Sequence, residues 1–328
     1  KEAGIELGDV EHVAINQNSK ANLWRKIRFT LSERPDFGFV MDRLKNKRER
    51  TSVREKLSTF DKNLFKGEVH EIEHHYAHLS SAFHVSPFED ATVVSVDGFG
   101  DFASSAWGVG HGSEISIDER VYFPHSLGIF YQAITQWLGF PNYGDEYKVM
   151  GFAPYGNPNY MDEMHKIVLL NDNGGFRLNL DYFQHHKKKI DYEWGDCEPK
   201  VGKLFSDGLV DLLGPCRQKG EELSNYHKDI AHSMQKMYEE TFFNLLNVLH
   251  KRHGGENLCL AGGCVGNVKL NYEFRKIPQV NSVYVFPHMG DGGLSLGAAM
   301  AARMECSEGQ ASSLSSCAPG LRSERVPL

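Results

Sequence analysis

Apolar and polar positions alternate along this chain with two periods, one typical of strands and one typical of helices. Short apolar runs such as 92–96 and 282–286 indicate buried strands, whereas apolar residues three and four positions apart indicate helices that bury one face. The predicted strands are 10–16, 92–96, 104–110, 113–123, 176–180, 257–260 and 282–286. The predicted helices are 73–84, 126–139, 162–170, 220–253, 268–276 and 294–304.

Three segments lack a clear period. Residues 21–50 form a polar, basic connection with some helical character, and residues 142–160 carry many Gly and Pro residues, so we expect a loop there. Residues 181–218 form an irregular polar insertion that contains Trp194. Long loops in compact domains are often functional. The alternation of strands and helices elsewhere predicts an α/β fold.

The two ends of the sequence do not resemble domain boundaries. Residues 1–5 have the pattern of a helix that is ending, with Gly4 as its C-cap, so we expect a segment upstream of them. The apolar periodicity stops near residue 304, and the last residues are rich in Ser, Gly and Pro. This composition predicts a disordered tail over 305–328.

Composition and charge narrow the class of protein. The chain has 328 residues, of which 41% are hydrophobic and 24% are charged, as in ordinary globular proteins with a sizeable core. A net charge of −7 argues against a general nucleic-acid binder, because phosphate contacts need concentrated Lys and Arg. The six cysteines include no C-x-x-C pair, which suggests reduced thiols. No apolar stretch approaches the ~20 residues that span a bilayer and no secretory signal is evident, so we expect a cytoplasmic protein without a membrane partner.

The sequence HHYAH at 74–78 indicates a metal site. His74 and His78 are four residues apart on a predicted helix, so their imidazoles point from the same face. Asp97 and Asp291 each follow a predicted strand, and ligands of open α/β sheets gather at the carboxyl ends of strands. Two imidazoles and two carboxylates suit Fe(II), Mn(II) or Zn(II). The alternative is a solvated histidine pair and two ordinary Asp-Gly turns.

Glycine-rich turns follow both strands of the last third of the chain, at 261–267 and 287–293. Backbone without side chains lets a phosphate or an adenosine approach a helix N-terminus, whose free N–H groups favour anions. Tight packing of the turns is the alternative explanation. The P-loop pattern G-x-x-x-x-G-K-[ST] is absent, so ATP would have to be held in another way.

Five motifs occur in the order seen in O-carbamoyltransferases of the nodulation-factor and antibiotic-biosynthesis type. The chain resembles this family over residues 1 to 304, and the resemblance implies an actin-like ATPase (ribonuclease H-like) fold of two similar lobes with mixed sheets flanked by helices. The motifs are HHYAH at 74–78, VDGFGD at 96–101, DEYKVMGFAPYG at 145–156, AGG at 261–263 with Asn267, and GDGG at 290–293.

The resemblance implies a two-step reaction. Carbamoyl phosphate and ATP, with Mg²⁺, are first converted to carbamoyl-adenylate in a separate YrdC-like domain, and the present lobe passes the carbamoyl group to a hydroxyl of a sugar, nodulation factor or antibiotic-like molecule. It also implies an iron-type metal on His74, His78, Asp97 and Asp291, and a nucleotide held by Gly262, Gly263, Asn267 and Gly292.

Two further residues, Glu146 and Lys148, match the loop near the transferred group, and Asp101 is a third candidate for the reaction. Lys148 could stabilise the developing oxyanion, and Glu146 or Asp101 could accept the proton of the attacking hydroxyl. Lys148 could equally pair with Glu146 or Asp145 on the loop surface. Acceptor choice is expected to depend on loops such as 181–218, and neither the acceptor, the metal nor the oligomeric state follows from the sequence.

The family pattern includes two parts that this sequence lacks, a first strand hairpin with a phosphate turn and the YrdC-like domain. We therefore expect carbamoyl phosphate and ATP to give no carbamoylated product with this chain alone. Two other hypotheses remain, a tRNA threonylcarbamoyl transferase-like enzyme and a non-catalytic actin-like nucleotide-binding module. The first would need to bind tRNA despite the acidic composition. A sugar kinase of this fold has no need of an imidazole pair.

Overall fold

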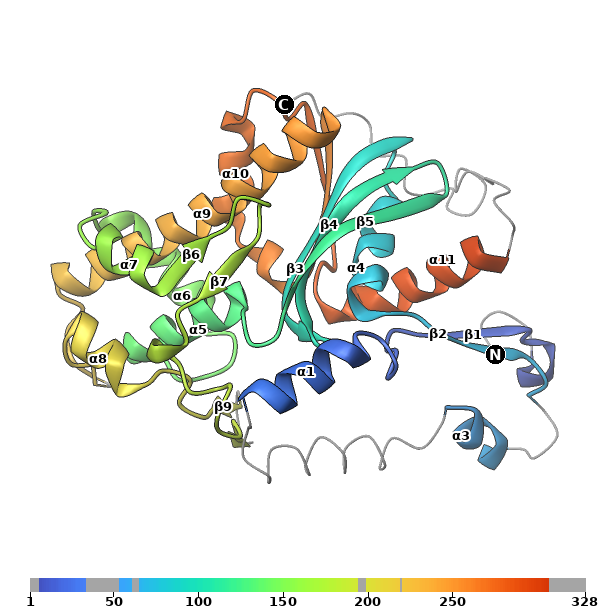
Figure 1. Cartoon of the computed structure of the whole chain (residues 1–328), viewed down its shortest axis with the longest axis horizontal. Coiled ribbons are helices and arrows are strands. Elements are labelled where there is room, and N and C mark those ends of the chain that lie inside the picture. The colour runs from blue at the N-terminus through green and yellow to red at the C-terminus, as the bar shows by residue number, and fades with distance from the viewer. Residues whose placement is uncertain (1–5, 34–52, 61–64, 194–198, 219, 307–328) are drawn as a thin grey trace.

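A five-stranded mixed sheet forms the centre of the computed structural model, which describes residues 6–33, 53–60, 65–193, 199–218 and 220–306 (Figure 1). Its strands, in spatial order, are β11 (Ser282–Val285), β10 (Asn257–Ala261), β3 (Asp90–Gly100), β4 (Ala103–His111) and β5 (Glu114–Tyr122).

The strand directions identify the topology. Strands β3, β4 and β5 form an antiparallel meander, and β10 and β11 extend it in parallel on the side of β3. This is the strand order of the ribonuclease H-like fold, so the predicted α/β class is confirmed. Within the described ranges the other sheets have two strands each, among them the pair of β1 (His12–Ile15) and β2 (Glu68–Glu71). No second sheet of similar size in these ranges represents the other predicted lobe.

Helices cover both faces of the sheet at β3 and β10, which is why these two strands are buried over successive residues without alternation. Val93 faces α4 (His74–Phe83), and Val94 faces the other side, where α5 (Leu127–Trp137) and α9 (Asn225–His253) pack. α11 (Leu294–Cys306) lies against α4, and Gly297 permits the contact because a Cβ there would lie 1.9 Å from the Ala77 carbonyl oxygen. In Figure 1 these two helices lie on one side of the sheet and α5 and α9 on the other.

The remaining described elements surround this core. They are η1 (Leu7–Asp9), α1 (Leu23–Glu33), α3 (Val53–Phe60), α6 (Glu146–Phe152), η2 (Ala153–Tyr155), α7 (Met161–Ile167), β6 (Val168–Leu170), β7 (Phe176–Leu178), η3 (Leu180–Tyr182), β8 (Tyr192–Glu193), β9 (Lys200–Val201), α8 (Asp207–Leu213), η4 (Gly263–Gly266), α10 (Val268–Glu273), η5 (Phe274–Lys276) and η6 (Asp291–Gly293). Every predicted strand and helix has a counterpart here, although the predicted helix 162–170 ends in strand β6.

Two predictions of irregular structure were wrong. The expected loop 142–160 contains helix α6, and the insertion 181–218 contains helix α8. Both helices are only seven residues long, too short to show a clear helical period. Gly144 precedes α6 and Pro154 follows it, and both residue types are typical of loops. Trp194, Gly4 and the predicted tail from residue 307 onwards lie outside the described residues.

Candidate functional site

Four predicted ligands converge at the carboxyl end of β3. His74 and His78 extend from α4, Asp97 from β3 and Asp291 from η6, and one donor atom of each lies within 4.8 Å of those of the others. Both Nε2 atoms lie 3.2 Å from Oδ2 of Asp97, and that of His78 lies 3.6 Å from Oδ1 of Asp291. We refer to these four residues as the buried cluster.

The backbone around the cluster explains how the histidines are held. α4 begins immediately after Glu73, whose side chain accepts a hydrogen bond from the Tyr76 N–H and caps the helix. The ring of His74 fits only because residue 100 is glycine, since a Cβ there would lie 2.0 Å from the ring. Gly100 therefore provides room for a ligand rather than conformational freedom.

Asp97 holds the cluster to the glycine-rich turn after β10. Ala261 is paired with Ser95, so the turn begins beside Asp97, whose Oδ1 accepts a hydrogen bond from the Gly263 N–H at 3.1 Å. Burial would raise the pKa of Asp97, but the two imidazoles outweigh it and hold this pKa well below its usual value. The carboxylate is therefore ionised, and its Oδ2 faces two nitrogens that can bind a cation.

The four predicted ligands differ in burial. His74, His78 and Asp97 are largely buried, whereas the Asp291 side chain is 73% exposed. Burial lowers the pKa of His78, but its contacts with Asp291 and Asp97 outweigh that effect and raise it. The donor types and separations fit a divalent cation, and the exposed side leaves a position for a further ligand, as in catalytic rather than structural metal sites.

The glycine turns are built partly for packing. Gly262 has φ +95, and a Cβ there would lie 2.1 Å from the Val96 carbonyl oxygen. The close approach of the turn after β10 to β3 therefore requires glycine at this position. Gly263 is exposed beside Asp97. A Cβ built on Gly290 would lie 3.8 Å from the Cα of Gly263, so the two glycine turns meet at the cluster. Gly292 is exposed in the second turn next to Asp291.

Asn267 points into the protein rather than towards the open turn. Its Oδ1 accepts the Leu270 N–H at 2.9 Å and so caps α10, and its Nδ2 donates to Oε1 of Gln235 at 2.9 Å. Gln235 also accepts a hydrogen bond from the Tyr131 hydroxyl. These contacts give Asn267 a structural role, and its part in holding a nucleotide stays a prediction.

The three predicted reaction residues lie in different environments. Lys148 forms an ion pair with Asp145, which is buried and accepts the Asn142 N–H at 2.9 Å, so the predicted pairing within this segment occurs with Asp145. Glu146 begins α6, and burial raises the pKa of its carboxyl. Asp101 accepts the N–H groups of Asn18 and His74 on one oxygen, at 2.8 and 3.0 Å.

A third imidazole was missed in the sequence. His75 is completely buried behind the cluster, where its Nδ1 lies 2.9 Å from the Ser95 hydroxyl. Burial, and then the neighbouring His74 and His78, lower its pKa to about 3, so it remains neutral.

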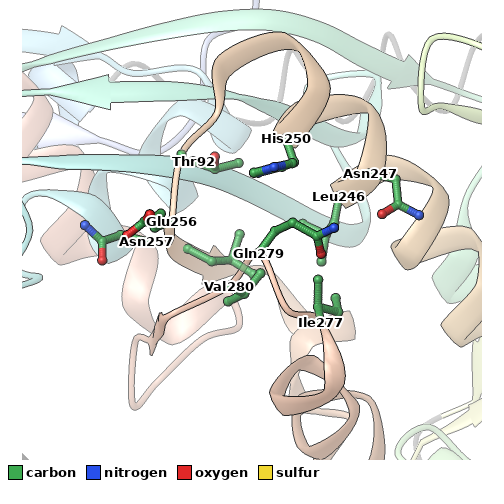
Figure 2. Close-up of a pocket in the computed structure, with 11 residues that line it drawn as sticks. Thr92, Leu246, Asn247, His250, Glu256, Asn257, Ile277, Gln279 and Val280 are labelled. Atoms are coloured by element: carbon green, nitrogen blue, oxygen red, sulfur yellow. The ribbon is translucent and has the colours of Figure 1, made fainter.

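Two hollows lie away from the cluster. One is at the opposite ends of β3 and β10, where Thr92, His250 and Asn257 surround about 20 Å³, room for about one water molecule (Figure 2). The other encloses about 520 Å³ and belongs mainly to the insertion 181–218, with Lys188 and Lys200 among its lysines. No helix among the described residues is long and apolar enough to cross a bilayer.

Comparison with known proteins identifies the family. The model for the carbamoyltransferase N-terminus matches residues 15–300. Over 232 residues, which are 70% of its length, this chain is 34% identical to nodulation protein NolO of Bradyrhizobium diazoefficiens and to nodulation protein NolNO of Sinorhizobium fredii. These matches cover 38% of NolO and 30% of NolNO. The chain is also 37% identical over 230 residues, again 70% of its length, to uncharacterized protein sll1178 of Synechocystis, of which it covers 35%.

The chain thus spans about a third of the length of these curated relatives. Two solved structures of HypF, one from T. kodakarensis and one full-length form with bound phosphate and nucleotide, are 12% and 17% identical. Each has a TM-score of 0.40 over 78% of this chain, covering 39% and 46% of HypF, and this likeness supports no inference about the site. From the family match and the order of its motifs, the chain belongs to the carbamoyltransferase N-terminal family.

Proposed function

We propose that this chain is the metal-binding lobe of an O-carbamoyltransferase, which passes a carbamoyl group from carbamoyl-adenylate to a hydroxyl of a sugar, nodulation factor or antibiotic-like molecule. The observation that carries the proposal is the convergence of His74, His78, Asp97 and Asp291 beside the exposed Gly263 turn. Membership of the carbamoyltransferase family supports the reaction class.

The buried cluster would hold Fe(II), Mn(II) or Zn(II). A bound divalent cation would supply a Lewis acid for the anionic mixed anhydride. Gly263 keeps the space over Asp97 open, because a Cβ there would lie 2.9 Å from Oδ1. Phosphate of the adenylate can therefore approach the cluster from the exposed side of Asp291, between the two glycine turns.

Glu146 is the residue we propose as proton acceptor for the attacking hydroxyl. Its pKa is raised by burial, which brings its basicity closer to neutral pH. Lys148 stabilises the start of α6 through Asp145, so we assign it a positioning role. Asp101 is likewise a positioning residue, because one of its oxygens accepts the N–H groups of Asn18 and His74. We expect the basic hollow of the insertion 181–218 to discriminate between acceptors.

The test uses the full-length protein loaded with Fe(II) and supplied with carbamoyl phosphate, ATP and a panel of sugars. We expect carbamoylated sugar by mass spectrometry and AMP in equal amount. Asp97→Asn should abolish both, whereas Asp90→Asn, an exposed carboxylate at the start of the same strand, should retain them. Wild-type turnover by Asp97→Asn would overturn the role of the cluster, and metal-loaded protein that carbamoylates no acceptor would overturn the function.

A further inference from the structure

A second group of metal-binding side chains lies at the other end of α11. His12 in β1, His70 in β2 and Cys306 at the end of α11 bring two ring nitrogens and a thiol together. Nδ1 of His12 lies 2.9 Å from Nε2 of His70, and Sγ of Cys306 lies 3.9 Å from each of these nitrogens. We refer to these three residues as the exposed cluster, because His12 and Cys306 are exposed and His70 is half-buried.

The strand register places both histidines on one face of the β1–β2 pair. Ala14 is paired with His70 in parallel register, and His12 precedes Ala14 by two residues, so all three side chains point the same way. Ala14 packs against a buried apolar cluster that includes three alanines of α11, and β1 contacts this helix, so this face lies against α11. The last residue of α11 is Cys306, which completes the group from a segment 236 residues or more away along the chain.

The separations fit one ion between the three donors. Tetrahedral zinc with bonds of about 2.0–2.1 Å to nitrogen and about 2.3 Å to sulfur places two nitrogens about 3.3 Å apart and sulfur about 3.6 Å from nitrogen. The observed distances of 2.9 and 3.9 Å differ from these values by a few tenths of an ångström, which exposed side chains can adjust by small rotations. A thiolate with two imidazoles is a softer donor set than the buried cluster and favours Zn(II) over Mg²⁺ or Mn(II).

We propose that His12, His70 and Cys306 bind a zinc ion, with water in the fourth position. Binding converts the Cys306 thiol to a thiolate and releases its proton to solvent, and it replaces the hydrogen bond between the two imidazoles, whose shared proton moves to the ring nitrogen that faces away from the ion. The ion joins the β1–β2 pair to the end of α11, whose opposite end follows Asp291 of the buried cluster. The exposed cluster thereby restrains the helix that positions one ligand of the other site.

Cobalt substitution provides a direct test, because Co(II) takes zinc sites and its bond to a thiolate gives a charge-transfer absorption in the near ultraviolet. The buried cluster contains no sulfur, so this absorption distinguishes the exposed cluster from the buried cluster. We expect the band in Co(II)-loaded wild-type protein and in Asp97→Asn, and its complete loss in Cys306→Ser and His70→Gln. Cys216→Ser, which removes a half-buried thiol elsewhere, is the matched control and should retain it.

Metal content separates this proposal from the proposed function. Zinc-loaded Cys306→Ser should lose the metal of the exposed cluster and keep that of the buried cluster, and the reverse is expected for Asp97→Asn. Circular dichroism checks that each variant is folded, which is expected for Cys306→Ser because the residue is exposed. A wild-type protein without the charge-transfer band, or a band that persists in Cys306→Ser, would overturn the zinc site and leave only a hydrogen bond between His12 and His70.

Discussion

The buried and exposed clusters lie at the two ends of α11 and are built in opposite ways. The buried cluster uses two imidazoles of one helix and two carboxylates at strand ends, and its ligands are fixed by a helix cap, a glycine and a backbone N–H. Each cluster joins three elements, α4, β3 and η6 for the buried cluster and β1, β2 and α11 for the exposed cluster. The first is positioned by rigid local structure, whereas the second depends on the packing of α11 against β1.

This difference has a functional consequence. Ligands held rigidly by surrounding hydrogen bonds can keep a cation in the geometry that catalysis requires, and an exposed edge admits substrate. Where ligands meet only through tertiary contacts, the bound metal mainly restrains those contacts. We therefore expect changes in the buried cluster to affect chemistry most, and changes in the exposed cluster to affect order at the end of α11.

The largest expected effect comes from Asp97→Asn. Asparagine keeps the shape of the side chain but removes the charge that faces both Nε2 atoms. Changes to residues around a metal ligand already cost about 10–100-fold in affinity, so loss of a charged ligand should weaken binding by more than about 100-fold. Isothermal titration with Mn(II) measures this, with Asp90→Asn as control. Unchanged affinity would show that the buried cluster does not bind the ion.

The second largest effect is expected from a variant that changes the packing around His74. Gly100→Ala places a Cβ 2.0 Å from the imidazole, so the ring must move, and overpacking of this kind costs about 1–3 kcal/mol of unfolding free energy. Gly98→Ala is the matched control two residues earlier on β3, where a Cβ would meet nothing within 4 Å. Urea denaturation compares their stabilities and titration compares their metal affinities. Equal behaviour of the two variants would contradict the role of Gly100.

Much of the fold and of the buried cluster could be predicted because both depend on local patterns. The apolar run of β3 ends at Asp97, and the four-residue spacing of His74 and His78 fixes their common face. The exposed cluster could not be predicted, since no pattern links His12 or His70 to a cysteine at the far end of the chain.

Two residues of the predicted site, Asn267 and Lys148, have side-chain partners that depend on the structure around them. Asn267 follows a glycine turn and matches a nucleotide-binding motif, yet its side chain caps α10 and contacts Gln235, a residue of α9 that sequence patterns do not bring near it. Lys148 pairs with Asp145 because both lie at the start of α6, in a segment expected to be a loop. Side-chain partners depend on tertiary placement, which a motif does not specify.

A third test compares the ligands within the buried cluster. Asp291 is 73% exposed, so water can replace its carboxylate when it is removed. Asp291→Asn should therefore weaken metal binding by only about tenfold, equivalent to about 1.4 kcal/mol. Asp207→Asn, with a side chain that is 95% exposed on α8, serves as control in the same titration. A loss as large as that of Asp97→Asn would mean that the exposed ligand holds the ion as tightly as the buried one.

The smallest effect concerns acid stability of the metal-free protein. Burial lowers the pKa of His75 to about 3 in the folded protein, whereas this pKa is about 6.5 in the unfolded chain. Protons therefore bind more tightly to the unfolded chain, and protonation favours unfolding. The contribution of His75 to stability is complete above about pH 6.5 and declines as the pH falls, by about 1 kcal/mol between about pH 7 and about pH 5.5.

His75→Gln should flatten this decline without removing it, because burial also lowers the pKa of His125 and His185 to about 4. Urea denaturation at the two pH values, in the presence of a chelator, measures both slopes. The size of the change depends on the unfolded-state pKa, since His75 stays neutral in the folded protein throughout this range. Parallel slopes for wild type and variant would mean that the imidazole behind the buried cluster gains a proton before the protein unfolds, and that the interior of this site is less rigid than its packing implies.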